Sequence, residues 1–259
     1  MNDNQVMSSS PPLYKSHTGA EYFKRITSLE RNRRVRSAYQ DLVLRIAPHG
    51  AALFDFGAGP GIDARFFAER GFTVDAYDVD PKMCDFFAEH CRDLIDSGRI
   101  TLERGDYQEF LTRRTSGTEG RIDMIISNFA PLNQADHLHE LFAKFHALTV
   151  PDGKALVSVL NPCYIQDMTS RWWWRNARRL WRDGHYFVSG GQAPAHSRRR
   201  LADFVELSSP YFQLTRVFRG LPPYRRQHLN GVDVRRGGRF AWLQLATCQF
   251  MLLLFEKRK

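Results

Sequence analysis

The 259-residue chain has few cysteines and no long apolar run. Its four cysteines form no CxxC pair and lack metal-ligand spacing, which excludes a disulfide framework and predicts reduced, mostly packed thiols. The longest apolar run, residues 250–255, is far too short to span a bilayer. Residues 1–12 are polar and rich in Ser and Pro, without the apolar core of a secretory signal. We therefore expect a cytoplasmic protein.

The chain carries a net charge of +9, although its apolar fraction of 43% and charged fraction of 25% are ordinary for a globular protein. The positive charge is uneven, since arginines concentrate in residues 171–239 whereas the segment around residues 57–61 is nearly balanced. A basic region of this kind suits nucleic acid, an anionic membrane or an acidic substrate, and equally an ordinary Arg-rich surface. Composition leaves these four interpretations open.

The most informative motif is an apolar strand that ends in a glycine-rich turn. Residues 53–61 read Leu-Phe-Asp-Phe-Gly-Ala-Gly-Pro-Gly, and the apolar spacing of residues 62–70 predicts a helix that Gly71 ends. A strand, a glycine turn and a helix let a backbone approach a nucleotide-like ligand closely, with the helix N-terminus facing an anionic group. A dinucleotide fingerprint would place glycine at position 62, where this chain has Ile62. The motif therefore predicts a different nucleotide-like cofactor.

Apolar periodicity predicts alternating strands and helices along most of the chain. One or two helices over residues 19–47 come first, followed by strands at 51–56, 72–78, 100–103, 122–127 and 155–160 and helices at 63–70, 81–95, 108–114 and 135–148. This order predicts an α/β fold, a mostly parallel sheet with helices on both faces. Segments 212–219 and 247–256 add two strands, and their connection shows no convincing helix, so we expect an antiparallel pair at a sheet edge.

Four segments together resemble the motifs of class I S-adenosylmethionine-dependent methyltransferases that act on small molecules. They are residues 53–61, residues 74–83, Gly105-Asp106 and residues 123–129, and the resemblance covers about residues 40–160. It implies a Rossmann-like sheet of seven strands with an antiparallel C-terminal strand, and S-adenosylmethionine as cofactor. We expect a disordered tail over residues 1–15 and a single domain over residues 16–259.

The resemblance also implies roles for particular residues. Asp78 ends the second strand about 20 residues after Gly57, where an acidic side chain binds ribose hydroxyls in nucleotide-binding α/β folds. By motif, the other cofactor-binding residues would be Asp55, Gly57, Gly59 and Gly61 at the methionine end, Asp106 and Tyr107 beside the adenine, and Asn128 and Phe129 where methyl donor meets acceptor. Asp55 equally suits a carboxylate that orders the loop, and Asp106 a helix cap.

Methyl transfer from a sulfonium is an in-line displacement, so the protein mainly aligns the reactants and excludes water. A hydroxyl acceptor benefits from a base, for which His137 and His139, after the 128–133 loop, are the candidates. We expect no metal, because residues 127–133 lack the carboxylate cluster of the metal-dependent members. The same segment lacks the Asn-Pro-Pro-aromatic motif of enzymes that methylate bases, so a small organic acceptor and O-methylation are favoured. The alternatives are a tRNA or rRNA methyltransferase and a non-catalytic cofactor-binding protein.

An insertion over residues 161–211 should select the substrate. Residues 170–182 predict a strongly amphipathic helix, with Trp173, Trp174, Ala177, Leu180 and Trp181 on one arc and five arginines on the opposite one. It suits a packed lid whose Trp173, Trp174 and Arg178 contact substrate, a helix at the inner face of an anionic membrane, or a clamp for an anionic ligand. The basic cluster of residues 198–200 is expected in solvent. The oligomeric state stays open.

Overall fold

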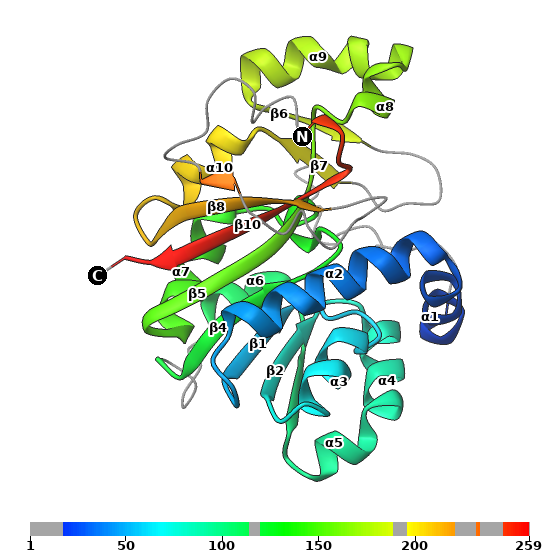
Figure 1. Cartoon of the computed structure of the whole chain (residues 1–259), viewed down its shortest axis with the longest axis vertical. Helices are drawn as coiled ribbons and strands as arrows, with labels where there is room; N and C mark the ends of the chain where they lie inside the picture. Colours follow the sequence, from blue (N-terminus) through cyan, green and yellow to red (C-terminus); the bar gives the residue numbers. More distant parts are fainter. Residues whose placement is uncertain (1–17, 114–119, 189–195, 221–231, 234–245, 259) are drawn as a thin grey trace, which may run out of the picture.

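A mixed eight-stranded sheet runs through the middle of the protein, as the computed structural model shows (Figure 1). The structure describes residues 18–113, 120–188, 196–220, 232–233 and 246–258. The strand order is β3-β2-β1-β4-β5-β10-β8-β9. The strands are β1 (Ala52–Phe56), β2 (Thr73–Asp78), β3 (Ile100–Arg104), β4 (Ile122–Ser127), β5 (Thr149–Leu160), β8 (Phe212–Gly220), β9 (Val232–Asp233) and β10 (Phe250–Lys257).

The five strands from β3 to β5 are parallel, and β10 is antiparallel to both β5 and β8. The predicted antiparallel pair is therefore confirmed, and so is the Rossmann-like sheet of seven long strands. The two-residue strand β9 adds an eighth at the edge, paired with β8. Apart from β9 and residues 246–249, the connection between β8 and β10 lies outside the described residues, as does the predicted tail over residues 1–15.

Helices cover both faces of the sheet and bury two apolar cores. The first face packs on α2 (Glu30–Ile46), α3 (Ile62–Ala68), α4 (Pro81–His90) and α5 (Arg92–Asp96), with α1 (Gly19–Ser28) against α2 and α4. The second face packs on α6 (Tyr107–Thr112), α7 (Leu138–Leu148) and α10 (Leu201–Ser208). The hydroxyl of Tyr39 in α2 donates to Leu156 O at 2.7 Å and accepts from Ser127 N at 2.8 Å, so α2 is joined to β4 and β5.

Two predicted helices differ from the structure in their limits. The helix expected over residues 81–95 is interrupted at Cys91, whose backbone leaves the helical region between α4 and α5. The helix expected over residues 135–148 begins only at Leu138, because His137 adopts a left-handed backbone (φ 54°) that a helix cannot pass through. A short 3-10 helix, η1 (Pro131–Asn133), precedes it.

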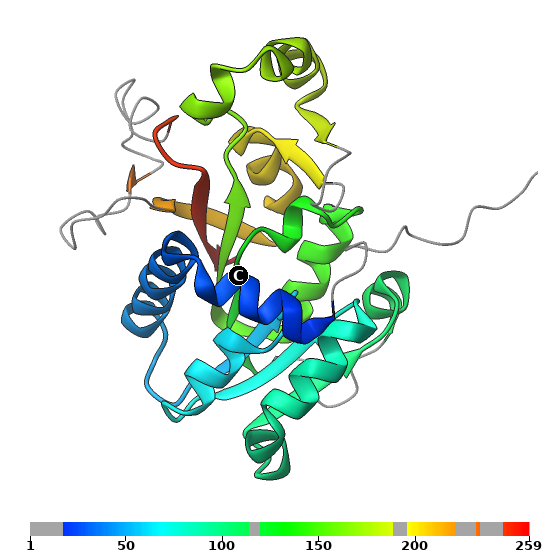
Figure 2. The ribbon, with the colours of Figure 1, turned by 90° about the vertical axis from the view of Figure 1, so that its right-hand side faces the viewer.

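Within the insertion, α10 packs on the second face of the sheet, whereas the described residues before it form a small layer beyond the carboxyl end of β5, at the top of both views (Figures 1 and 2). This layer contains α8 (Ile165–Met168), α9 (Arg171–Asp183) and a separate antiparallel pair, β6 (His185–Val188) and β7 (His196–Arg199). The predicted helix over residues 170–182 is confirmed as α9. None of the helices that the structure describes has the length and apolarity to cross a membrane.

The prediction that residues 198–200 lie in solvent is wrong for Arg198, which is buried, and Arg199 and Arg200 are only half-buried. The guanidinium of Arg198 is buried, forms an ion pair with Asp167 at 2.5 Å and donates to Asn161 O at 2.9 Å. The Arg198 guanidinium also lies 5.9 Å from the centre of the Trp172 ring.

Candidate functional site

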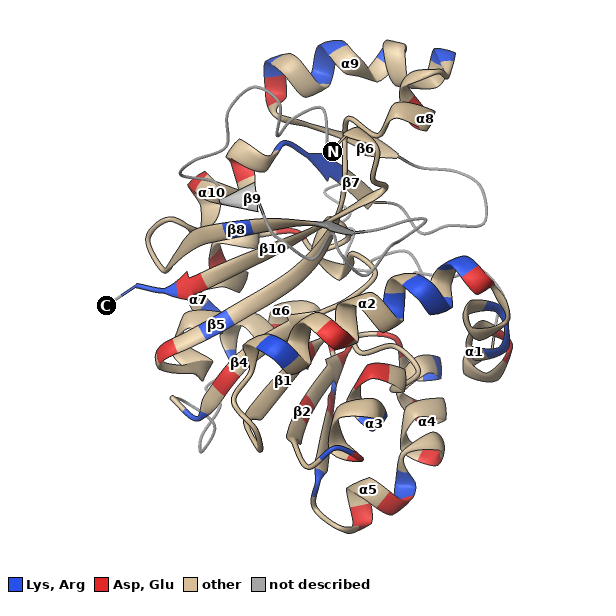
Figure 3. Cartoon of the chain, in the orientation of Figure 1, with Lys and Arg blue, Asp and Glu red and all other residues tan. Residues whose placement is uncertain are grey.

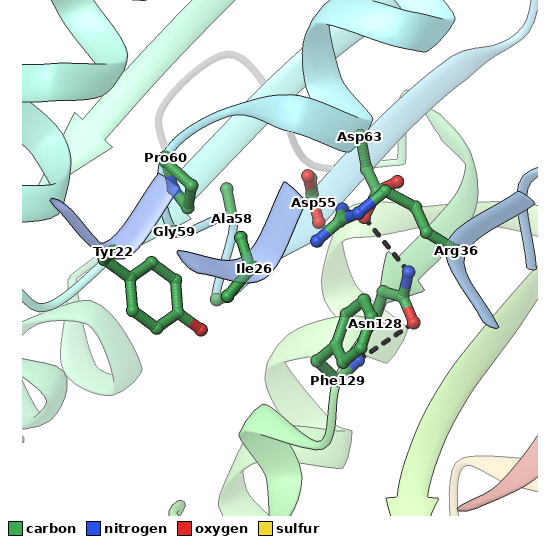
Figure 4. A pocket seen from close by; sticks show the side chains of 11 residues that line it. Tyr22, Ile26, Arg36, Asp55, Ala58, Gly59, Pro60, Asp63, Asn128 and Phe129 are labelled. Atoms are coloured by element: carbon green, nitrogen blue, oxygen red, sulfur yellow. Dashed lines mark hydrogen bonds and ion pairs between the residues drawn. The ribbon is translucent and has the colours of Figure 1, made fainter. Parts of the chain in front are cut away.

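A pocket opens at the carboxyl ends of β1 and β4, where the strand order of the sheet reverses direction (Figure 4). Crevices at this point are the usual ligand sites of open α/β sheets. The pocket is open to solvent, and its space together with that mouth amounts to about 390 Å³. Its lining residues are Tyr22, Ile26, Arg36, Asp55, Gly57, Ala58, Gly59, Pro60, Asp63, Asn128 and Phe129.

The glycine turn needs its glycines for two different reasons. Gly57, Gly59 and Gly61 all have positive φ, at 72°, 56° and 80°. A Cβ on Gly57 would lie 2.5 Å from Pro131, and one on Gly61 would lie 2.8 Å from the ring of Phe87. A Cβ on Gly59 would meet nothing within 4 Å. Packing therefore requires Gly57 and Gly61, whereas Gly59 leaves space that a ligand can fill.

Asp55 is a buried carboxyl group that lines the pocket, with only 2% of its surface exposed. Its Oδ2 atom has no hydrogen-bond partner among the described residues. Burial raises the pKa of Asp55 well above its usual value, and the nearby carboxylate of Asp63 raises it further. Because a buried acceptor without a partner is costly, the group is suited to a cationic or hydrogen-bond-donating ligand.

Asp63 lies beside Asp55 in the pocket lining and connects the residues around it (Figure 4). It lies in the first turn of α3, forms an ion pair with Arg36 of α2 and accepts from Gln40 Nε2 at 2.7 Å and Asn128 Nδ2 at 3.1 Å. These contacts join α2, α3 and the loop after β4. Arg36 and Asp63 were not among the site residues predicted from the sequence. Asp63 could have been found as the acidic residue next to the glycine turn, but Arg36 is one of four arginines in residues 31–36 and carries no distinguishing signal.

The loop after β4 has a strained backbone at two consecutive residues. Phe129 and Ala130 have φ of 61° and 67°, a region that side chains disfavour. Asn128 supports the loop because its Oδ1 accepts from Phe129 N at 2.9 Å. The Phe129 ring lies 4.7 Å from the guanidinium of Arg36 and meets the ring of Phe250 edge-on at 5.8 Å. This strained backbone thus places the ring of Phe129 in the pocket wall, where it forms an aromatic surface.

Asp78 is tied directly to the glycine turn from the end of β2. Its Oδ2 accepts from Gly59 N at 2.7 Å and its Oδ1 accepts from Asp80 N at 2.9 Å. Burial raises the pKa of Asp78 to about 6, although these backbone hydrogen bonds oppose the shift. Asp78 does not line the pocket itself, but it lies next to the turn that does.

The predicted adenine-side residues lie beyond the pocket lining. Asp106 is exposed and caps α6, accepting from Gln108 N at 2.7 Å. The hydroxyl of Tyr107 donates to Asp136 O at 2.7 Å. Both residues follow the carboxyl end of β3, the strand that pairs with β2. They therefore lie at the same edge of the sheet as Asp78, which ends β2. Their roles toward a cofactor stay predictions.

The predicted catalytic and lid residues do not line the pocket. His137 is exposed and lies 3.7 Å from Glu140, and His139 packs edge-on against Tyr211. Trp173 is buried in α9, whereas Trp174 and Arg178 are exposed on it. Within the described ranges, no three His, Cys, Asp or Glu side chains gather in a group that could hold a metal ion.

The chain matches the family model described as a methyltransferase domain over residues 30–193. None of the curated proteins compared with the chain matches it.

Solved structures of methyltransferases share the fold. A putative S-adenosylmethionine-dependent methyltransferase from Listeria monocytogenes is 14% identical, with a TM-score of 0.60, over 87% of this chain and 99% of that one. The 1,6-didemethyltoxoflavin-N1-methyltransferase of Burkholderia thailandensis, with 1,6-didemethyltoxoflavin and S-adenosylhomocysteine bound, is 17% identical, with a TM-score of 0.56, over 95% and 92%. A chain in the complex between the Haloferax volcanii Trm112 methyltransferase activator and the putative methyltransferase is 14% identical, with a TM-score of 0.58. The match covers 93% of this chain and 96% of that one.

Proposed function

The chain belongs to the methyltransferase domain family, and from this premise we propose that it methylates a hydroxyl group of a small organic acceptor. The protein is an S-adenosylmethionine-dependent methyltransferase with the Rossmann-like fold of class I. We also propose that residues 16–259 form one domain in which the insertion over residues 161–211 selects the acceptor. The acceptor class and the methylated atom are the parts of this proposal that need a test.

The residues present fit S-adenosylmethionine. The orphaned Oδ2 of Asp55 suits the ammonium of its methionine end, and the open space at Gly59 suits the close approach of its backbone. Asp78, at the end of β2, would hold the ribose hydroxyls. When bound, this cofactor supplies a methyl group on a positively charged sulfur. The chain contributes alignment and the exclusion of water, for which Tyr22 and Ile26 of α1 cover the pocket.

The aromatic wall at Phe129 is the observation that carries the acceptor class. Phe129 lines the pocket beside Tyr22 and is backed by Phe250, so a small aromatic or lipid-like molecule would find apolar surface there. Arg36 lies over the same ring and would stabilise the oxyanion of an acidic hydroxyl, whereas it would repel an ammonium. Both features favour an acidic hydroxyl on an apolar body.

Labelled methyl transfer tests this proposal. The protein is incubated with S-adenosylmethionine carrying a ¹³C methyl group and matched pairs of aromatic phenols and anilines, and products are assigned by NMR. We expect O-methyl products from the phenols, and a Phe129→Ala variant with a higher KM for them but an S-adenosylhomocysteine affinity close to that of the wild type. Products methylated only on nitrogen or carbon would contradict the proposal.

A tRNA or rRNA acceptor is the second candidate, and the net charge of +9 favours it. In Figure 3 the positions of Lys and Arg, coloured blue on the ribbon, fall on several elements, with α2 and α9 prominent among them. The same label supplied with total RNA distinguishes the candidates, because an RNA methyltransferase would transfer it to nucleotides. We further propose a cytoplasmic enzyme at the inner face of a membrane, supported by the basic, tryptophan-rich helix α9.

A further inference from the structure

Helix α9 is the outermost element at one end of the molecule (Figures 1 and 2). Trp173, Ala177 and Leu180 form its inner face and are 3%, 7% and 2% exposed. The indole Nε1 of Trp173 donates to Pro162 O at 2.6 Å, and Ser170 caps the helix by accepting from Trp173 N. The inner face therefore anchors the helix to the rest of the protein, and the opposite, outer face of the helix points to solvent.

Two tryptophans of the predicted apolar arc are exposed. Trp174 is 63% exposed and Trp181 is 71% exposed. They are seven residues apart, so they lie two turns apart on the same side of the helix, beside the packed face. Trp174 contacts only the edge of the Trp173 ring among the aromatic pairs of the described residues, at 4.9 Å. Two large exposed aromatic side chains on one side of an anchored helix indicate a contact surface.

Arginines fill the rest of the outer face. All five arginines of α9 are exposed, namely Arg171, Arg175, Arg178, Arg179 and Arg182. The helix contains one acidic residue, Asp183, which forms an ion pair with Arg182 at 2.7 Å. The ribbon of α9 in Figure 3 accordingly carries several blue Arg positions along its length. The outer face thus combines two indoles with a strong excess of positive charge.

We propose that the outer face of α9, formed by Trp174, Trp181 and the five arginines, docks on the surface of a membrane that contains anionic lipids. Indoles favour the boundary between headgroups and acyl chains, and guanidinium groups bind lipid phosphates. The charge of the helix is complementary to an anionic leaflet. This docking surface goes beyond the methyl-transfer activity and does not depend on which atom of the acceptor is methylated.

The shape of the surface favours a membrane over single-stranded RNA. Proteins that bind single strands combine stacking aromatics with a positively charged groove that follows the backbone. The outer face of α9 is instead the convex side of one helix at the tip of the molecule (Figure 2). A broad lipid surface can contact such a face along its whole length, and the indoles, which border the packed side, would enter it together.

Co-sedimentation of the full chain with lipid vesicles tests the proposal. We expect binding to phosphatidylcholine vesicles that contain 30 mol% phosphatidylglycerol, and much weaker binding to phosphatidylcholine alone. A Trp174→Ala/Trp181→Ala variant should lose most of this binding, and an Arg175→Gln/Arg178→Gln variant should lose roughly fivefold per arginine at low salt. The matched controls are Phe187→Ala, which removes an exposed aromatic outside this face, and Arg45→Gln/Arg92→Gln, which removes two exposed arginines elsewhere.

Each variant must keep the circular dichroism spectrum and the S-adenosylhomocysteine affinity of the wild type. A loss of vesicle binding then reports on the surface of α9, and not on unfolding or on the proposed acceptor chemistry. Quenching of tryptophan fluorescence by brominated lipids should occur in the wild type and disappear in the double tryptophan variant. Equal partitioning of that variant and the wild type, or no preference for anionic vesicles, would overturn the proposal. So would binding to poly(U) that needs both tryptophans while vesicles are not bound.

Discussion

Asp55 is a buried carboxyl group whose raised pKa couples the protein to pH in a definite direction. The folded apo protein keeps a proton on Asp55 that the unfolded chain has already lost. The contribution of this group to stability is therefore complete near pH 4 and below, and it declines as pH rises toward the folded pKa. An ammonium group bound beside Asp55 would instead favour the ionised carboxylate and so lower the pKa of Asp55.

Replacing Asp55 by Asn should separate stability from cofactor affinity. We expect Asp55→Asn to flatten the dependence of apo stability on pH and to match or exceed wild-type stability near pH 8. Its affinity for S-adenosylmethionine should fall by about tenfold or more, since a charge-assisted hydrogen bond is lost. Thermal unfolding across pH and titration calorimetry measure the two effects. The control is Asp75→Asn, a partly buried aspartate of β2 with a raised pKa outside the pocket, and unchanged affinity in Asp55→Asn would refute the assignment.

Asp78 has a pKa of about 6 in the folded protein, which places its titration in an accessible range. Its contribution to apo stability is present near pH 4 and is lost as pH rises toward 6, because the unfolded carboxyl ionises first. If ribose hydroxyls donate to the ionised form, S-adenosylhomocysteine affinity should increase about tenfold from pH 5 to pH 7. Calorimetry in two buffers of different ionisation enthalpy should show proton release at pH 5.5. If the affinity of an Asp78→Asn variant changed with pH as steeply as that of the wild type, the titrating group would not be Asp78.

At the scale of elements, the glycine turn between β1 and α3 combines a backbone requirement with a steric one. Alanine at Gly57 or Gly59 should destabilise the fold by about 1–2 kcal/mol, because both positions have positive φ and an alanine disfavours this left-handed backbone. Only Gly57→Ala also collides with Pro131, which should add about 1–3 kcal/mol of overpacking. Urea unfolding should rank Gly57→Ala as the less stable variant. Gly59→Ala should remain folded but bind S-adenosylhomocysteine weakly, and the reverse ranking would refute this division of roles.

The elements around the turn also show how far local patterns reach. The strand 52–56, the turn and the helix that follows were predictable because period-two and period-3.6 patterns and glycine all act locally. The break at Cys91 was not predictable in this way, since the apolar pattern continues through it. The ion pair of Arg36 with Asp63 was equally hidden, because it joins α2 to α3 across 27 positions of sequence.

At the scale of the whole molecule, Arg198 attaches the insertion to the main sheet. It bridges Asp167 of α8 and the carbonyl of Asn161 at the end of β5. We expect Arg198→Met to destabilise the protein by about 2–4 kcal/mol, because Asp167 would be left partly buried without its partner. Hydrogen exchange should then increase mainly in α8, α9 and β7.

Arg200→Met is the matched control from the same segment. Its ion pair with Asp203 spans one helical turn and is more exposed, so the loss should stay below about 1 kcal/mol. Equal losses in the two variants, or exchange that increases throughout the sheet, would show that Arg198 does not act as the attachment.

The sequence by itself determined the order of strands and helices, the glycine turn and the amphipathic character of α9. These depend on side-chain periodicity and on backbone freedom, which neighbouring residues decide. Only the tertiary structure decided that Arg36, Asp63 and Asn128 meet in one pocket wall, that Arg198 is buried and that Trp174 and Trp181 are exposed. Each of these depends on which elements pack together, and a local pattern does not specify the partner that a helix face will meet.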